Sequence, residues 1–250
     1  MPAVLKRLFS GARRTFRAPP NSCIYAIGDI HGRADLLSEV YRRIRTDGSK
    51  AERRVVVHVG DYVDRGDQSR AVIDLILSKP LAGFQCVHLL GNHEQFMMDF
   101  LHNAAVGPVW FMNGGDATLA SYRVALKGGD TREAMMLRLQ QDFREKLPPE
   151  HRTFLNTLKL MHREGDYLFV HAGIRPGAAL EAQVPEDVLW IREEFLDSGT
   201  NHGACVVHGH TITDQPEFKK NRIGIDTGAF MSGRLTCLVL EGEDQRVLQT

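Results

Sequence analysis

Five times along this chain, a short apolar run rich in β-branched residues ends in a turn that carries Asp, Asn or His. The runs and their turns are Ile24–Ile27 before Gly28-Asp29-Ile30-His31-Gly32, Val55–Val59 before Gly60-Asp61-Tyr62-Val63-Asp64-Arg65-Gly66, Cys86–Leu90 before Gly91-Asn92-His93-Glu94, Tyr167–Val170 before His171-Ala172-Gly173, and Cys205–Val207 before His208-Gly209-His210-Thr211. Short apolar runs bounded by glycine are typical of buried strands. The turns therefore lie at strand ends, where α/β sheets bind their ligands.

Helical spacing separates the first three runs, over residues 34–45 and 69–78, and Ser69 is the expected N-cap of the second helix. Strand–helix–strand alternation predicts a largely parallel sheet for the first half of the chain. Residues 95–165 are amphipathic and predict a helical insert. Three later strand-like runs predict antiparallel or mixed pairing: Ile223–Asp226, Arg234–Leu240 and Arg246–Leu248.

The composition fits one sizeable core, because the 250 residues are 43% hydrophobic and 25% charged. We therefore expect a single domain over residues 21–250. The formal net charge is zero, so we expect no nucleic-acid partner. Residues 1–20 contain Lys and Arg but no acid and predict a flexible basic leader, with a peripheral membrane or partner contact as the alternative.

A cytoplasmic location is predicted from the absence of two signals. No segment has the apolar region and cleavage site of a secretory signal, and no window is apolar enough to span a bilayer. The cysteines form no C-x-x-C pair and lie in or beside apolar runs, so we predict buried thiols in a reducing compartment. These cysteines are Cys23, Cys86, Cys205 and Cys237.

The turn side chains form a candidate site for two metal ions. Asp29 and His31 are two residues apart and can reach one ion, whereas the two carboxylate oxygens of Asp61 can bridge a pair. Three further side chains complete the ligand set of the second ion: Asn92, His171 and His210. This oxygen and imidazole set favours Mn²⁺, with Fe or Zn as alternatives, over magnesium. A bridged pair of ions can deprotonate a shared water for in-line attack at phosphorus.

Together, these blocks resemble the signature segments of the PPP-type serine/threonine phosphatases, within the calcineurin-like metallophosphoesterase superfamily. The resemblance covers roughly residues 22–240. Ala172-Gly173 and the short C-terminal region make the chain more similar to the compact bacterial branch. The resemblance implies a four-layer αββα sandwich, in which two mixed β-sheets are flanked by helices. It also implies the metal roles given above.

The same resemblance implies the remaining site residues. His93 matches the general acid that protonates the leaving oxygen, and Asp64 matches the carboxylate that orients it. Arg65 and Arg192 match the two arginines that bind the phosphate, together with Asn92. A guanidinium group suits this role because it binds phosphate oxygens in a bidentate manner and stays charged.

The function implied is hydrolysis of phosphoserine and phosphothreonine monoesters in a protein or peptide, by direct attack of a hydroxide that bridges the two metals. A symmetrical diadenosine tetraphosphatase is the alternative. An inactive relative used as a binding module would lack a ligand or His93, and none is missing. Other polar residues are predicted to pack near the site without binding metal: His58, His88, Glu94 and His208. For Asn113, substrate contact and a plain loop both remain open.

Overall fold

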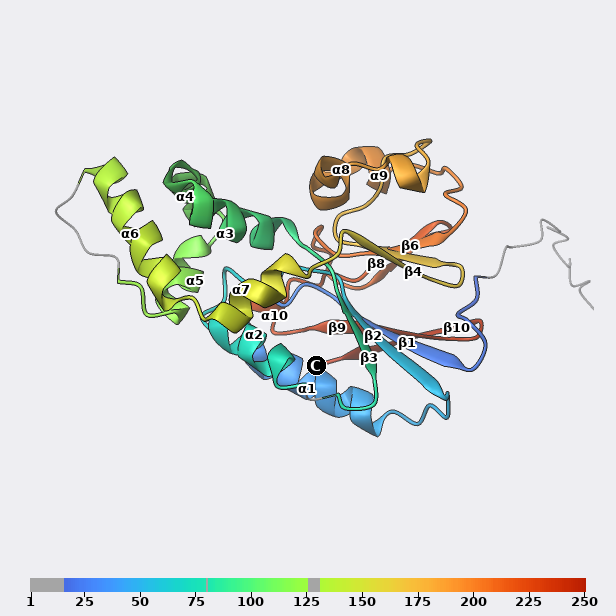
Figure 1. Ribbon diagram of the computed structural model, residues 1–250. Helices are drawn as coiled ribbons and strands as arrows, with labels where there is room; N and C mark the ends of the chain where they lie inside the picture. Colours follow the sequence, from blue (N-terminus) through green and yellow to red (C-terminus); the bar gives the residue numbers. More distant parts are fainter. Residues whose placement is uncertain (1–15, 80, 126–130) are drawn as a thin grey trace, which may run out of the picture.

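Two mixed β-sheets form the centre of the computed structural model, which describes residues 16–79, 81–125 and 131–250 (Figure 1). The first sheet has the order β10 (Asp244–Gln249), β9 (Thr236–Glu241), β1 (Ser22–Ile27), β2 (Arg53–His58) and β3 (Gln85–His88). The second has the order β4 (Met161–Glu164), β5 (Tyr167–Val170), β6 (Cys205–His208), β8 (Arg222–Gly224) and β7 (Glu217–Phe218).

Parallel pairing aligns the carboxyl ends of the strands that precede the predicted site turns. In the first sheet β1, β2 and β3 are parallel, and Ile27 pairs with His58, which in turn pairs with His88. In the second sheet β5, β6 and β8 are also parallel. The predicted parallel first half is therefore confirmed, and the last two strands, β9 and β10, are antiparallel as expected.

Helices cover the outer faces of both sheets. The helices that share one apolar cluster with the first sheet are α1 (Ala34–Thr46), α2 (Ser69–Leu77), α3 (Asn92–His102), α4 (Gly107–Met112), α5 (Gly115–Ser121), α6 (Arg132–Lys146), α7 (Pro149–Asn156) and the short α10 (Ala229–Ser232). The second sheet carries α8 (Pro185–Trp190) and α9 (Glu193–Leu196). Figure 1 shows α8 and α9 above the second sheet, with α1 and α2 on the opposite side of the molecule.

Alternating side chains divide the core into layers. Ile24 and Ala26 of β1 face a cluster shared with Tyr167 and Phe169 of the second sheet, whereas Tyr25 of the same strand packs under the helices. A third apolar cluster joins the second sheet to α8 and α9. These layers confirm the predicted αββα sandwich. Within the described residues, no helix is both long and apolar enough to cross a membrane.

The helix cap at Ser69, the burial of the cysteines and the N-terminal leader differ in part from the sequence-based predictions. Ser69 is the first residue of α2 and does not cap it, because its hydroxyl accepts the backbone N–H of Asp64. Cys86 is exposed, since β3 is an edge strand, whereas the other three cysteines are buried. Residues 1–15 of the predicted basic leader lie outside the described residues. The next residues of the leader are bound to the rest of the domain, because the backbone amides of Arg17 and Ala18 donate to Asp166 and to the carbonyl of Gly242.

Candidate active site

The five predicted turns meet at the carboxyl ends of β1, β2, β3, β5 and β6 and are joined by backbone hydrogen bonds. The amides of Ile30 and His31 both donate to the carbonyl of Asp61, at 3.0 and 2.9 Å. The amide of Gly209 donates to the carbonyl of His171 at 2.8 Å. Turns that are far apart in the sequence therefore form one structure.

Backbone strain is concentrated in these turns. Five predicted site residues have φ between 44° and 70°, which is uncommon for residues other than glycine. They are His31, Asp61, Asp64, Arg65 and His210. Such strain persists only where the surroundings fix the backbone, and it is found most often at functional sites. Gly91 adds a close approach, because a side chain there would collide with the carboxylate and backbone nitrogen of Asp61.

Two groups of potential metal ligands share Asp61. One group contains His31, Asp61 and His93, and the other contains Asp61, His171 and His210. Within each group, the ligand atoms lie within 4.8 Å of one another. Asp61 Oδ2 lies 3.4 Å from His31 Nε2, and Asp61 Oδ1 lies 3.4 Å from His171 Nε2. The two oxygens of one buried carboxylate therefore face different groups.

Hydrogen bonds to the far side of the imidazole rings orient the candidate ligands. His31 Nδ1 lies 2.8 Å from the carbonyl of Val63, and His171 Nδ1 lies 3.0 Å from that of Val59. A carbonyl can only accept, so each ring carries its proton on Nδ1 and presents the lone pair of Nε2 to the site. Asn92 Oδ1 lies 2.9 Å from His171 Nε2, which places the predicted amide ligand beside the second group.

Asp29 is near both groups but belongs to neither. Its Oδ2 accepts the amide of His210 at 2.9 Å, whereas its buried Oδ1 has no partner. His210 Nε2 and Asp226 Oδ2 are also buried without partners. Asp226 was not predicted as a site residue, although it too follows a strand, β8, and precedes Thr227 and Gly228.

The electrostatics of the site fit bound cations. Burial lowers the pKa of His31 to about 3 and also lowers that of His210, so both rings are neutral and free to bind metal. Burial, followed by the charges of Asp226 and Asp61, raises the pKa of Asp29 well above its ordinary value. Buried carboxylates this close together repel one another, and divalent cations would remove that cost.

His93 and Asp64 form a buried pair beside the ligand groups. His93 Nδ1 lies 2.7 Å from Asp64 Oδ2. The same carboxylate accepts hydrogen bonds from Trp110 Nε1 at 2.8 Å and Thr118 Oγ1 at 2.6 Å. Burial lowers the pKa of His93, but the charges of Asp61 and Asp64 outweigh it and raise that pKa. Trp110 and Thr118 were not predicted in this role.

The two predicted phosphate-binding arginines lie at the edge of this centre. Arg65 Nη2 is 3.3 Å from His93 Nε2, and its guanidinium lies 4.8 Å from the ring centre of Phe230. Arg192 Nη1 donates to Thr211 Oγ1 at 3.1 Å, directly after His210 in the sequence. The structure therefore brings both arginines to the turns that carry the candidate ligands.

Residues 24–226 match the family model described as calcineurin-like phosphoesterase. The chain belongs to this family. It is a hydrolase that acts on phosphoric ester bonds. Its predicted similarity to bacterial PPP-type phosphatases is also confirmed.

Relatives of this phosphoesterase carry the names of different activities. Serine/threonine-protein phosphatase 1 of Salmonella typhimurium is 28% identical over 221 residues, which cover 85% of this chain and 89% of the relative. A symmetrical bis(5'-nucleosyl)-tetraphosphatase of Aromatoleum aromaticum is 31% identical over 74% of this chain and 55% of the relative. The crystal structure of a cold-active protein tyrosine phosphatase from a psychrophilic Shewanella has a TM-score of 0.55 at 18% identity and covers 93% of this chain and 83% of its own. That structure supports the fold alone.

Glu94 organises the turn after β2 in this phosphoesterase. Its carboxylate accepts four backbone amides, those of Asp61, Tyr62, Val63 and Gly91, at 2.8 to 3.2 Å. Burial and the nearby Asp61 raise the pKa of Glu94 to about 8, whereas the converging amides favour the ionised form. The predicted role of Glu94 in holding the turn is confirmed by these contacts.

The other histidines of the predicted surroundings belong to neither ligand group. His58 stacks on His88 with ring centres 4.7 Å apart and bonds the hydroxyl of Tyr41 at 2.8 Å. His208 Nδ1 lies 3.0 Å from the carbonyl of Gly209. Asn113 follows α4 in the short turn before α5 and donates its amide to the carbonyl of Val109 at 2.9 Å, so its side chain is held against the preceding helix.

Proposed function

We propose that this phosphoesterase is a metal-dependent phosphoprotein phosphatase that hydrolyses phosphoserine and phosphothreonine monoesters. The observation that carries the proposal is the shared carboxylate of Asp61, which faces two ligand groups next to the buried His93–Asp64 pair. A two-ion centre beside a proton donor is suited to hydrolysis of an ester with a poor leaving group. We also propose that residues 21–250 act as one domain, in the cytoplasm.

The proposed ligands are those expected from the sequence. Asp29 and His31 would hold one ion and Asp61 would bridge. The second ion would be held by Asn92, His171 and His210. When bound, two divalent ions polarise the phosphoryl oxygens and lower the pKa of a shared water. The imidazole and carboxylate set favours Mn²⁺, with Fe or Zn as alternatives.

His93 is proposed to donate the proton to the leaving serine or threonine oxygen. An alkoxide is a poor leaving group, so the proton must arrive as the ester bond breaks. Asp64 accepts a hydrogen bond from Nδ1, which leaves Nε2 to carry the transferred proton. Arg65, Arg192 and the Asn92 amide would bind the phosphate oxygens, because guanidinium and amide groups can donate hydrogen bonds to them.

Hydrolysis of dinucleoside polyphosphates is the second candidate. It is favoured by the similarity to the Aromatoleum relative, whose name gives that activity. A nucleotide enzyme also needs an aromatic face for a base. Phe96 and Trp190 form an edge-to-face pair with ring centres 5.1 Å apart, and Trp190 lies 6.4 Å from the ring of His210. The Trp190 nitrogen donates to Gln95, which restricts the rotation of this ring.

A paired substrate assay tests the proposal. The protein is loaded with Mn²⁺, Fe or Zn, and kcat/KM is measured for a phosphoserine peptide and for diadenosine tetraphosphate, with and without chelator. We expect the peptide to be the better substrate and the chelator to abolish turnover. Faster cleavage of the dinucleotide would replace the phosphoprotein assignment, and full activity in chelator would disprove the metal mechanism.

A further inference from the structure

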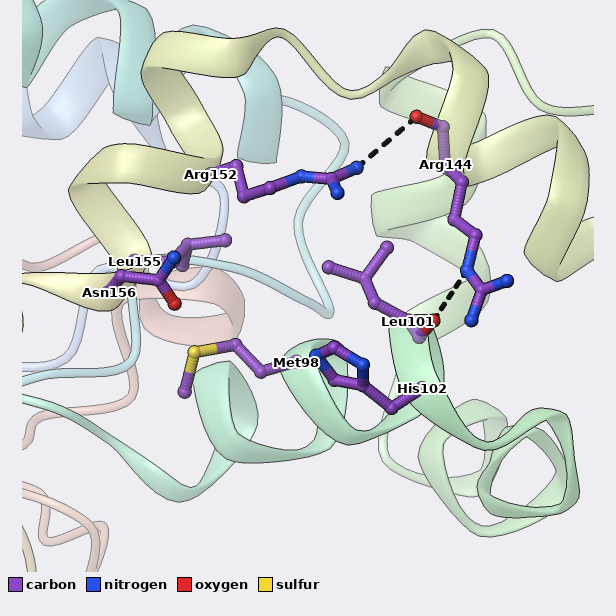
Figure 2. Close-up of a pocket in the computed structure, with 7 residues that line it drawn as sticks. All are labelled: Met98, Leu101, His102, Arg144, Arg152, Leu155 and Asn156. Carbon is purple, nitrogen blue, oxygen red and sulfur yellow. Dashed lines mark hydrogen bonds between the residues drawn. The ribbon is translucent and has the colours of Figure 1, made fainter.

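A cavity of about 470 Å³ lies between α3, α6 and α7, in the helical segment and outside the candidate active site (Figure 2). Its apolar side is formed by Met98, Leu101 and Leu155. Leu101 and Leu155 are buried, whereas Met98 is half-buried and adaptable in shape. The cavity therefore has an apolar wall on which an apolar side chain of a bound partner can pack.

Two arginines line the same cavity without an acidic partner. In Figure 2, Arg152 of α7 and Arg144 of α6 extend over the residues of α3. Arg144 Nε donates to the carbonyl of Leu101 at 2.5 Å, and Arg152 Nη2 lies 3.4 Å from the carbonyl of Arg144. Within the described residues, neither guanidinium forms an ion pair with a carboxylate. Each group has five N–H donors, so most remain available to an anion.

Two further polar side chains lie at the edge of the cavity, and both can donate hydrogen bonds. These are His102, at the last turn of α3, and Asn156, at the last residue of α7. The cavity thus combines the positive charges of two arginines and two further hydrogen-bond donors with an apolar wall. Clusters of guanidinium groups of this kind bind carboxylate or phosphate oxygens of acidic peptides.

The position of the cavity links it to the candidate active site. Helix α3 begins at Asn92 beside the ligand groups and ends at His102 in the cavity wall. At 1.5 Å per residue, these ends are separated by about 15 Å along the helix. An extended peptide covers about 3.3–3.6 Å per residue, so this separation corresponds to four or five residues of substrate.

We propose that this cavity binds an acidic segment of the protein substrate, several residues from the phosphorylated side chain. Carboxylates of the segment pair with Arg144 and Arg152, and a neighbouring apolar side chain packs on Met98 and Leu101. The apolar wall favours a peptide over a polyphosphate chain, which has nothing to place there. The nature of this ligand rests on the proposed phosphoprotein activity.

The kinetic test compares the double variant Arg144→Gln, Arg152→Gln with wild type. Substrates are a phosphoserine peptide with a Glu-rich flank, the same peptide with Gln at those positions, and p-nitrophenyl phosphate. We expect KM for the acidic peptide to rise about three- to tenfold with unchanged kcat, because two exposed ion pairs would each contribute little binding free energy. The other two substrates should behave as in wild type. Equal KM changes for the acidic and neutral peptides would overturn the proposal.

Arg163→Gln is the matched control, because Arg163 is also an exposed arginine whose guanidinium bonds a backbone carbonyl, that of Gly165. It lies on β4, away from the cavity, and should leave every KM unchanged. A comparable loss of acidic-peptide affinity in this control would show a general charge effect and would also overturn the proposal.

A binding measurement separates this inference from the proposed function. Fluorescence anisotropy follows an unphosphorylated Glu-rich peptide, labelled with a dye, as it binds the full chain without turnover. We expect binding that weakens as salt rises and that falls about three- to tenfold in the double variant. This result would support the cavity site even if phosphopeptides were not hydrolysed. No difference between wild type and the double variant would disprove it.

Discussion

The strand-end turns and the helical segment from α4 to α7 contribute to the site in different ways. The turns are held together by buried backbone hydrogen bonds and contain residues in strained conformations. The helical segment reaches the same centre through side chains and one backbone contact. Trp110 and Thr118 bond the carboxylate of Asp64, and Gly114 lies against the backbone of Arg65.

This difference separates two functions of the structure. The turns form the proposed ion centre itself, so changes there should remove metal or unfold the loops. The helical segment fixes the orientation of the acid pair, so changes there should slow turnover while metal content stays normal. Each prediction below tests one side of this division.

The largest effect is expected for Asp61→Asn. The amide has one oxygen in place of two and no negative charge, so it would not bridge two cations. We therefore expect kcat/KM to fall at least about a thousandfold. Metal content, measured by mass spectrometry of the dialysed protein, should fall for both ions. Retention of two ions per chain would show that Asp61 does not join the two ligand groups.

His93→Ala separates an acid from a ligand. His93 lies within the first ligand group, at 3.8 Å from Asp61, so the geometry allows either role. As the acid, its loss should lower kcat for phosphoserine about 100- to 1,000-fold, and less for p-nitrophenyl phosphate, whose leaving group needs no proton. Metal content should stay normal. Loss of an ion, or equal defects with both substrates, would contradict the acid role. His162→Ala on β4 is the control.

Glu94→Gln tests how the turns are held. The amide would point an NH₂ group at backbone N–H donors that now share two carboxylate oxygens. We expect a loss of about 2–4 kcal/mol in the free energy of unfolding, measured in urea with the metal-free protein. The exposed Glu150→Gln should change it by less than about 0.5 kcal/mol. A Glu94→Gln variant as stable as wild type would show that the four bonds are not needed.

The smallest effect is expected for Thr118→Val in the helical segment. This change removes the hydroxyl that donates to Asp64 Oδ1 and accepts the Asp64 amide, while the side-chain volume is nearly kept. We expect kcat to fall about tenfold, which corresponds to one lost charged hydrogen bond, with normal metal content. Thr118→Ser keeps the hydroxyl and should stay within about twofold of wild type. Equal effects in both variants would point to packing instead.

The sequence predicted the layered fold and the meeting of the turns because both follow from local patterns. Strand ends in a parallel sheet share one edge, so Asp29 and Asp61 had to be neighbours once their strands paired. Asp226 follows β8 in the same way and could have been found by that rule. The sequence pattern predicts a strand over Ile223–Asp226, and this interpretation includes Asp226 in the strand and not in the turn after it.

Trp110 and Thr118 could not be predicted from local pattern. Each lies on a short helix, and the spacing of apolar residues in such a helix predicts only that one face is buried. Their partner Asp64 is 46 residues from Trp110 and 54 residues from Thr118 in the chain. Which carboxylate they reach depends on how α4 and α5 pack. The exposure of Cys86 was missed for a related reason, since a short apolar run does not reveal whether its strand lies at a sheet edge.

The close approach of Gly91 to Asp61 also limits which substitutions this protein can tolerate during evolution. Any single-base change in the first or second position of a glycine codon adds a side chain or a stop, and no side chain fits against that carboxylate. Inherited diversity in substrate choice must therefore arise elsewhere, and a mutagenesis library that aims for new specificity should spare this position and vary α6 and α7.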